Sequence, residues 1–253
     1  SINGDTYYGG TGTDTFDASA FTWATAVSID LTAKTWSYSA GSEVVDEFEN
    51  IEGANAQPGI VETLRGNELT NVINGNGGDD VIFGMNGDDV LGGGTGADQI
   101  NGGSGVDTAS YAASAAGVVV DLFAGTASGG DAQGDTLASI ENVTGSGADD
   151  TLTGNGGSNV LTGGLGADTL VYADNFTGST NVDTFNGDAG TDTFVLSNEA
   201  LDRRYVDLSV GQFQLNAGGD IRGYLNSIEN VTVASNHVVT GDDLANVITG
   251  TSA

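Results

Sequence analysis

Residues 75–107 read GNGGDDVIFGMNGDDVLGGGTGADQINGGSGVD and divide into consecutive blocks of nine residues. Every block begins with glycine and carries an aspartate at its sixth position. These aspartates are Asp80, Asp89, Asp98 and Asp107. Glycine in the first half of a block permits positive φ and close backbone approach, whereas the last three residues favour a strand. The stretch therefore predicts a tight turn followed by a short strand in each block.

The same block recurs at intervals, and its clear copies cover somewhat under half of the chain. The further copies are GGTGTDTFD from residue 9, GNELTNVIN from 66, GSGADDTLT from 145, GNGGSNVLT from 154, GGLGADTLV from 163, GSTNVDTFN from 178, GDAGTDTFV from 187 and GDDLANVIT from 241. The eighth residue is expected to point inward in all of them: Phe16, Ile73, Ile82, Leu91, Ile100, Ala109, Leu152, Leu161, Leu170, Phe185, Phe194 and Ile248. One aliphatic or aromatic column thus forms the predicted core.

A longer period of nearly ninety residues overlies the blocks. VSIDL at 27, VVVDL at 118 and YVDL at 205 each precede a polar stretch and then FENIEG, IENVTG or IENVTV. We expect one continuous repeat solenoid over 1–253, with unit 1 at 1–101, unit 2 at 102–186 and an incomplete unit 3 at 187–253. No segment has a helical period, so the fold class is all-β, with longer coils that bear loops.

Two blocks should complete one coil, so that residue i stacks on residue i+18 at a strand spacing of about 4.8 Å. Asp80 then lies beneath Asp98, and Asp89 beneath Asp107. Stacked carboxylates repel unless a cation lies between them. Calcium accepts six to eight oxygen ligands with tolerant geometry, whereas zinc prefers nitrogen or sulfur. The blocks therefore predict several Ca²⁺ ions as cofactors.

The composition agrees with a cation-dependent fold. Lys and Arg total 5 against 35 Asp and Glu, which gives a net charge of -30, and glycine contributes 42 of the 253 residues. Such a charge disfavours nucleic acid and anionic lipid as partners. The chain has no cysteine, no basic and apolar N-terminal signal, and no apolar run near the ~20 residues needed to cross a bilayer, so membrane insertion is not expected.

GGTGADQIN at 93 and GGSGVDTAS at 102 resemble the nonapeptide of the RTX, or haemolysin-type, calcium-binding family, whose form is G-G-x-G-x-D-x-U-x. This resemblance implies a right-handed parallel β-roll or β-helix with calcium in its turns. It also implies a bacterial protein exported by type I secretion, which requires no cleaved N-terminal signal, and hence an extracellular or cell-surface location.

The candidate calcium ligands are the turn carboxylates and the turn residues around them, which offer carbonyl oxygens. They are Asp14, Gly75, Gly77, Asp80, Gly84, Asn86, Asp89, Gly93, Thr95, Asp98, Gly102, Ser104, Asp107, Asp150, Asp168, Asp183 and Asp192. The strongest pairs are Asp80/Asp98, Asp89/Asp107 and Asp150/Asp168. We expect on the order of four to eight ions per chain.

Some blocks depart from the pattern. Asn71, Asn159 and Asn246 replace the aspartate, which favours weaker calcium binding or a metal-free turn. Glu62 and His237 hold the corresponding place one block earlier. A slip of six residues between Val171 and Gly178 puts the continuity of the Asp168 and Asp183 columns in question, and the Asp174/Asp192 spacing carries less weight.

Other notable residues have ordinary structural interpretations. Asp30, Asp121 and Asp207 are expected to cap turns rather than bind metal. His237 is expected to be a surface or packed residue. Core or edge packing is preferred to sugar stacking for the aromatic residues Trp23, Trp36, Tyr38 and Tyr224. Arg203 and Arg204 are expected to be a solvated pair.

No nucleophile elbow, metalloprotease motif or phosphate-binding loop is present, so we do not expect an enzyme. The chain is predicted to be a calcium-binding segment that folds and becomes rigid outside the cell, with a structural or adhesive role, as in an adhesin or surface layer. The alternative is a module of a secreted polysaccharide lyase or C5-epimerase. Both ends fall within a block, which predicts a segment of a longer protein or end-to-end stacking of identical chains. Extracellular polysaccharide is the other candidate partner.

Overall fold

The computed structural model of the chain describes residues 6–8, 14–17, 26–31, 33–38, 41–46, 50–52, 61–173, 181–196, 205–214, 221–234, 238–242 and 244–251. Over these residues the protein consists of strands joined by turns, with one short 3₁₀ turn, η1 (Gly130–Ala132). The all-β prediction is therefore confirmed. The chain forms two compact units, one of residues 1–111 and 125–140, the other of residues 112–124 and 141–253. The division into three sequence repeats stays a prediction.

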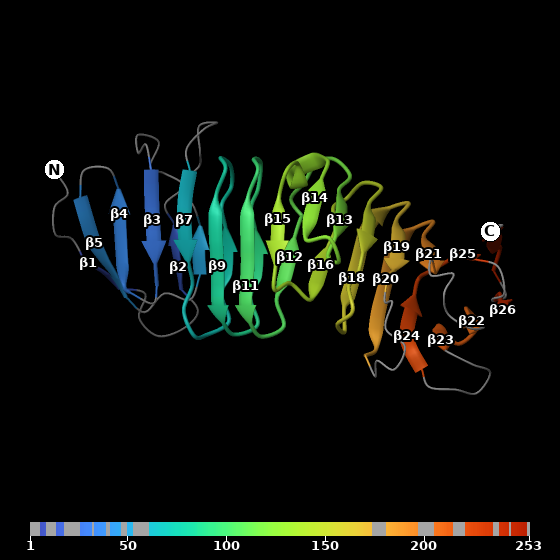
Figure 1. The fold of residues 1–253 in the computed structure, drawn as a ribbon. Helices are drawn as coiled ribbons and strands as arrows, with labels where there is room; N and C mark the ends of the chain where they lie inside the picture. The colour runs from blue at the N-terminus through green and yellow to red at the C-terminus, as the bar shows by residue number, and fades with distance from the viewer. Residues whose placement is uncertain are drawn as a thin grey trace. The chain divides into compact units, whose positions relative to one another are not determined.

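The first unit contains strands of two sheets (Figure 1). In hydrogen-bonded order, the larger sheet has β1 (Thr6–Tyr8), β5 (Gly41–Asp46), β4 (Thr35–Tyr38), β3 (Ala26–Asp30), β7 (Val61–Arg65), β9 (Val81–Asn86), β11 (Gln99–Ser104), β15 (Thr136–Ala138) and β14 (Thr126–Ser128). The smaller sheet has β2 (Thr15–Asp17), β6 (Asn50–Glu52), β8 (Val72–Asn74), β10 (Val90–Gly92) and β12 (Thr108–Ser110). From β7 to β12 the chain alternates between the two sheets.

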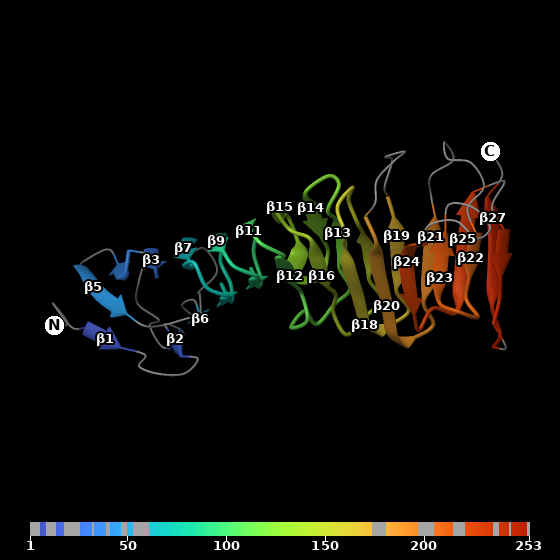
Figure 2. The same ribbon diagram turned by 90° about the horizontal axis from the view of Figure 1, so that it is seen from below.

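The second unit repeats this arrangement (Figure 2). One of its sheets has β13 (Val119–Asp121), β17 (Thr151–Thr153), β19 (Thr169–Tyr172), β21 (Thr193–Leu196), β25 (Asn230–Ala234) and β27 (Val247–Thr251). The other has β16 (Asn142–Thr144), β18 (Val160–Gly166), β20 (Asp183–Gly190), β24 (Ile221–Asn226), β23 (Gln212–Gln214), β22 (Tyr205–Asp207) and β26 (Val238–Thr240).

The predicted coil of eighteen residues is confirmed in the first unit. Val81 pairs in parallel with Gln99, and Val90 pairs in parallel with Thr108. Parallel pairs require a crossover connection, and here the intervening turn and opposite strand provide it. β9 and β11 accordingly run side by side in the same direction in Figure 1. Each coil thus places its two turns over those of the coil before it.

The six-residue slip in the second unit does not interrupt this stacking. Thr151 pairs with Thr169 at the usual eighteen residues, whereas Thr169 pairs with Thr193, twenty-four residues away. Val160 pairs with Thr184 at the same longer spacing. The six additional residues therefore lengthen one coil while the strands on both sides keep their register.

The core is the predicted column of eighth residues. Ile82, Leu91 and Leu170 are fully buried, and aromatic rings widen the column where Phe185 and Phe194 pack edge to face with centroids 4.9 Å apart. Neighbouring strand residues face outward, as the period of two requires. The prediction was wrong for Ile248, which is half exposed because its strand, β27, lies at the edge of its sheet.

The longer segments contain antiparallel strands, although the sequence predicted parallel ones. β4 pairs antiparallel with both β3 and β5, and β23 pairs antiparallel with both β22 and β24. Short turns follow the recurring Asp-Leu pairs of the sequence. The carboxylate of Asp30 accepts the N–H of Ala33 at 2.7 Å, that of Asp121 accepts Ala124 at 2.9 Å, and that of Asp207 accepts Ser209 at 3.0 Å. The predicted turn-capping role of these three aspartates is confirmed.

Candidate metal centre

The aspartates at the sixth position of the blocks link successive coils. The backbone N–H of Asp80 donates to Oδ1 of Asp98 at 2.7 Å, and the N–H of Gln99 donates back to the carbonyl of Asp80 at 2.8 Å. Asp89 and Asp107 make the same carboxylate contact at 2.9 Å. Each carboxylate therefore sits directly over the sixth residue of the coil below, as predicted.

These links continue into residues that the sequence pattern did not identify. The N–H of Asp98 donates to Oδ1 of Asp135 at 2.8 Å, and the hydroxyl of Tyr111 donates to Oδ2 of Asp135 at 3.0 Å. Asp135 thus continues the column of Asp80 and Asp98 although it lies thirty-seven residues after Asp98. Its only sequence signal is the triplet Asp-Thr-Leu, which also begins at Asp168.

The second unit has an equivalent column that spans the long coil. Oδ1 of Asp150 accepts the N–H of Val118 at 2.7 Å, and Oδ1 of Asp168 accepts the N–H of Asp150 at 2.9 Å. The N–H of Asp168 then donates to Asp192 at 2.8 Å, and that of Asp192 donates to the carboxylate of Glu229 at 2.7 Å. The Asp168 column is therefore continuous, and Glu229 is a further member that the sequence pattern missed.

The second oxygen of several of these carboxylates has no donor. Within the described residues, Oδ2 is buried without a hydrogen-bond partner in five column aspartates: Asp80, Asp89, Asp98, Asp168 and Asp192. Burial raises the pKa of Asp80 and Asp98 to about 7, and that of Asp89 and Asp168 to about 6, because the charged form loses water. A buried anionic oxygen without a donor calls for a cation.

The first glycine of a block leaves room for this oxygen. A Cβ atom built on Gly75 would lie 2.5 Å from Oδ2 of Asp80 and 2.6 Å from the carbonyl oxygen of Gly93 in the next coil. Gly84 is enclosed in the same way by Asp89 and by the carbonyl of Gly102. The carboxylate oxygen and a carbonyl from the next coil therefore converge on a space that any side chain would fill.

Six turns share one backbone feature at their second residue and are here called open. Their second residue has a positive φ, with values of 67° at Asn76, 89° at Met85, 89° at Gly94, 107° at Gly103, 109° at Gly164 and 66° at Asp188. The fourth residue is always glycine, and its φ is positive in five of the six turns, reaching 147° at Gly96 and 121° at Gly166, but not at Gly190. The open turns are residues 75–80, 84–89, 93–98, 102–107, 163–168 and 187–192.

In four other turns, here called closed, an oxygen of the sixth side chain accepts a hydrogen bond from the backbone of the same turn. The N–H of the second residue donates to its oxygen: Asn67 to Asn71 at 2.8 Å, Ser146 to Asp150 at 2.6 Å, Asn155 to Asn159 at 2.8 Å and Asp242 to Asn246 at 2.9 Å. None of the described second or fourth residues of these turns has a positive φ. The closed turns at the three asparagines agree with the predicted metal-free alternative.

The fifth residue adds another link where it is also acidic. Oδ1 of Asp79 accepts the N–H of Ala97 at 3.0 Å, and Oδ1 of Asp88 accepts the N–H of Val106 at 2.9 Å. These exposed carboxylates tie each turn to the coil above it, whereas the buried sixth residue receives its N–H from the coil below. Sequence reasoning selected only the sixth-position carboxylates and assigned no role to Asp79 or Asp88.

The open turns suit a hard cation with oxygen ligands. Their third residues also stack, because Gly77 bridges to Thr95 and Asn86 pairs with Ser104. In the described part of the chain, no three His, Cys, Asp or Glu side chains form a group that could hold an ion by themselves. Backbone carbonyls must therefore complete any site, which calcium accepts more readily than magnesium or zinc.

Several candidate residues remain only partly characterised. Asp14 is partly buried just before β2, but the rest of its turn lies outside the described residues. Oδ1 of Asp183 accepts the N–H of Asn159 at 2.8 Å, so this aspartate stacks on Asn159 across the slip of six residues. Tyr224 is 42% exposed. Five residues singled out in the sequence lie outside the described ranges: Trp23, Asp174, Arg203, Arg204 and His237. The side chains of Trp36 and Tyr38 are likewise not described.

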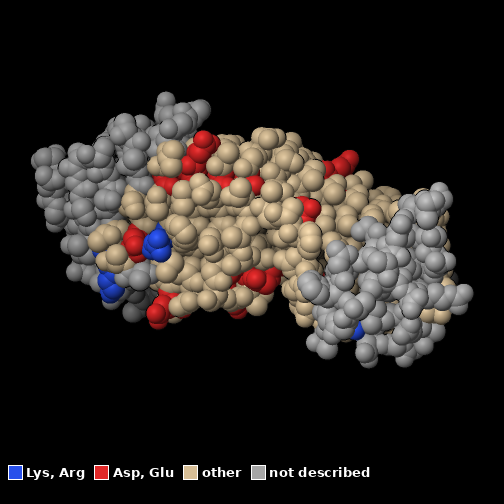
Figure 3. All heavy atoms as spheres, viewed as in Figure 1, with Lys and Arg blue, Asp and Glu red and all other residues tan. Residues whose placement is uncertain are grey.

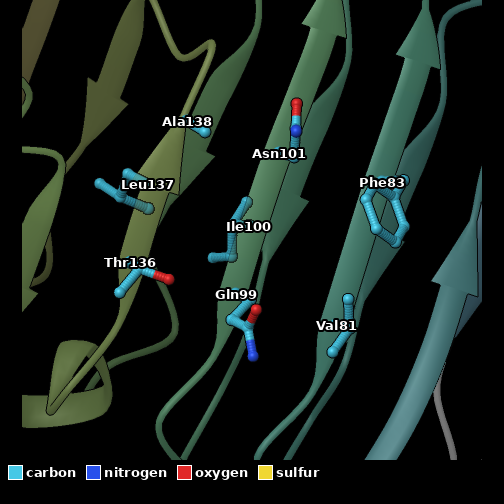
Figure 4. A pocket seen from close by; sticks show the side chains of 8 residues that line it. All are labelled: Val81, Phe83, Gln99, Ile100, Asn101, Thr136, Leu137 and Ala138. Atoms are coloured by element: carbon cyan, nitrogen blue, oxygen red, sulfur yellow. The ribbon is translucent and has the colours of Figure 1, made fainter.

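A shallow groove lies on the outer face of the first unit, over β9, β11 and β15 (Figure 4). It is lined by Val81, Phe83, Gln99, Ile100, Asn101, Thr136, Leu137 and Ala138. The guanidinium of Arg65 lies 4.5 Å from the centroid of the Phe83 ring. The groove volume of about 170 Å³ is below the ~300 Å³ at which typical ligand pockets begin.

The visible acidic side chains gather mainly toward the strand ends, where the turns lie, and the surface between them is largely uncharged (Figure 3). The described part of the chain contains no helix with the length and apolar character needed to span a bilayer.

Comparison with known proteins agrees with this geometry. Four copies of the RTX calcium-binding nonapeptide repeat match the sequence, at residues 65–100, 74–109, 134–170 and 171–198. These matches confirm the resemblance predicted from the blocks at 93 and 102, and they include all six open turns. Curated proteins give no match to the chain.

Proposed function

The chain carries RTX calcium-binding nonapeptide repeats, and on this premise we propose that its open turns bind several Ca²⁺ ions and that binding drives folding outside the cell. The observation that carries the proposal is the set of buried Oδ2 atoms without a donor. Without a cation these oxygens oppose folding, whereas a bound ion converts them into ligands. Binding free energy then becomes folding free energy.

We propose that each ion lies between two successive open turns of one column. Three such pairs occur among the described residues: 75–80 with 93–98, 84–89 with 102–107, and 163–168 with 187–192. The carboxylates of the sixth residues and the carbonyl oxygens of the turns are the proposed ligands. This assignment predicts at least three ions per chain, whereas the sequence alone suggested four to eight.

The wider proposal is a right-handed β-roll secreted by a bacterium through type I secretion, with a structural or adhesive role. The parallel pairing at eighteen residues and the excess of acidic residues support a β-roll that becomes rigid when calcium is abundant. End-to-end stacking of identical chains remains part of this proposal, and light scattering with calcium tests it.

Calcium binding is tested by native mass spectrometry together with circular dichroism. We expect at least three Ca²⁺ per chain in calcium and a largely unfolded spectrum in chelator, because the apo turns bury unpaired charge. The same titration with Mg²⁺ is the control and should fold the chain only at much higher concentration. An equally stable fold in chelator, with no bound ions in calcium, would contradict the proposal.

A second candidate is polysaccharide binding, either alone or as a module of a polysaccharide lyase or C5-epimerase. The groove over β9, β11 and β15 favours it, because Phe83 offers a ring face or edge and the amides of Gln99 and Asn101 make no hydrogen bond with the described residues. A glycan array with calcium should show binding that F83A abolishes. Depolymerised products from the same glycans would instead identify an enzyme.

A further inference from the structure

The turn at residues 145–150 is the one described case in which an aspartate at the sixth position occurs in a closed turn. It has Asp150 at the sixth position, like the open turns, yet it is closed. We propose that Ser146 and Ala148 hold this turn closed and that Asp150 is consequently not a calcium ligand. The inference rests on the proposed function and specifies which turns carry it.

The carboxylate of Asp150 is already satisfied by neutral donors. The N–H of Ser146 donates to Oδ2 at 2.6 Å, and the hydroxyl of Ser146 donates to Oδ1 at 2.9 Å. The N–H of Val118 also donates to Oδ1, at 2.7 Å. Both Ser146 and Asp150 are buried, at 4% and 2% exposure. An ion could bind this carboxylate only if these hydrogen bonds broke. Oδ2 of Asp168, in the next coil of the same column, has no such hydrogen bond.

The backbone conformation of residues 145–150 also disfavours an ion at Asp150. The open turn of the next coil has φ values of 109° at Gly164 and 121° at Gly166, its second and fourth residues. The corresponding residues here are Ser146 and Ala148, and a Cβ atom makes such conformations unfavourable. The hydroxyl of Ser146 also accepts the N–H of Ala148 at 3.0 Å, which holds both residues in the closed form.

The fourth position of an open turn accepts fewer residue types than the second. The second residue of an open turn can be Asn76, Met85 or Asp188, whereas the fourth is glycine in all six. Glycine alone is insufficient, because the closed turn at 154–159 retains Gly157 but ends in Asn159. An open turn therefore requires glycine at the fourth position and aspartate at the sixth, and 145–150 lacks the first of these.

Asp150→Asn and Asp168→Asn form a matched test, because these stacked residues occupy the same column and Asn159 shows that the fold tolerates the amide. Native mass spectrometry counts the ions, and circular dichroism gives the calcium concentration at half-maximal folding. D168N should lose at least one ion and raise this midpoint at least tenfold. D150N should retain every ion and change the midpoint less than twofold.

The converse variant, S146G/A148G, should gain one ion, because it frees the Asp150 carboxylate and permits positive φ. Loss of an ion in D150N, or a folded S146G/A148G that gains none, would overturn the inference. Failure of the proposed function is distinguishable, since the unmodified chain would then bind no ions at all.

Discussion

Replacement of Asp98 by asparagine should have opposite effects with and without calcium. Asp98 belongs to the open turn 93–98, where Oδ1 accepts the N–H of Asp80 and Oδ2 is buried without a donor. Asparagine keeps the acceptor at Oδ1 and removes the charge. Asn159 shows that its amide can donate to the carbonyl of the coil below, at 2.8 Å from Glu141. The change therefore preserves the stacking contact while eliminating a proposed ligand.

The magnitude without calcium follows from the raised pKa of Asp98. Burial raises this pKa from 3.8 to about 7, and the negative charges of Asp135 and Asp80 contribute further. At about 1.4 kcal/mol per pKa unit, the ionised carboxylate destabilises the calcium-free fold by roughly 4 kcal/mol at pH 8. Burying an amide has its own cost, so D98N should stabilise the calcium-free fold by about 2 kcal/mol.

With calcium the same change removes one binding site. An ion present at one hundred times its dissociation constant stabilises the folded state by about 2.7 kcal/mol. The gain in the free energy of unfolding on adding calcium should therefore be smaller by about this amount in D98N. The stability in calcium itself changes little, because the two effects nearly offset each other.

Two titrations followed by circular dichroism separate these effects. In chelator at pH 8, D98N should fold at a lower concentration of trimethylamine N-oxide than the unmodified chain. In calcium, urea unfolding gives the second stability. D121N is the control, because Asp121 caps an exposed turn outside the columns and should change neither measurement. A D98N chain that is less stable in chelator, or that gains as much from calcium as the unmodified chain, would refute the reasoning.

Two further predictions concern the same turns. Without calcium, the stability of the fold should rise as the pH falls from 8 to 5. Asp80 and Asp98 have pKa values of about 7 in the folded state against 3.8 in the unfolded state, so the folded state binds more protons. A lower osmolyte midpoint for folding at pH 5 would show this, and a higher one would contradict it. Gly75→Ala should destabilise the calcium-bound fold by about 1–3 kcal/mol, because its Cβ would overlap the Asp80 carboxylate and a carbonyl of the next coil. Gly250→Ala, whose Cβ would meet nothing within 4 Å, is the matched control in the urea titration, and equal losses in the two variants would exclude this explanation.

The period of nine predicts the fold from the sequence because one block specifies both a turn and a strand. Alternation of glycine, aspartate and an aliphatic residue fixes which side chains point inward, so Ile82 and Leu91 could be assigned to the core and Asp80 to the turn. The stacking of Asp80 under Asp98 then follows from the coil length alone.

The features that escaped prediction depend on contacts between residues far apart in the chain. Asp135 joins the column of Asp98 across thirty-seven residues, most of which lie outside any regular block, and Tyr111 reaches it from the segment that follows β12. The antiparallel strands β4 and β23 follow from local turns that interrupt the repeat. Aspartate at the sixth position also does not by itself determine the turn conformation, because the turn that ends in Asp150 is closed.

The hydrogen bonds to the carboxylates of the sixth residues all point the same way: the later coil supplies the accepting carboxylate and the earlier coil supplies the N–H. A cleavage between two coils consequently leaves unequal ends. The N-terminal piece retains a backbone N–H that has lost its acceptor, whereas the C-terminal piece exposes a carboxylate that water can solvate. At the sixth position, shortening the protein from its C-terminal side should thus leave an N–H without its acceptor, whereas shortening it from the N-terminal side should leave a solvated carboxylate, so the two ends of a column are chemically different.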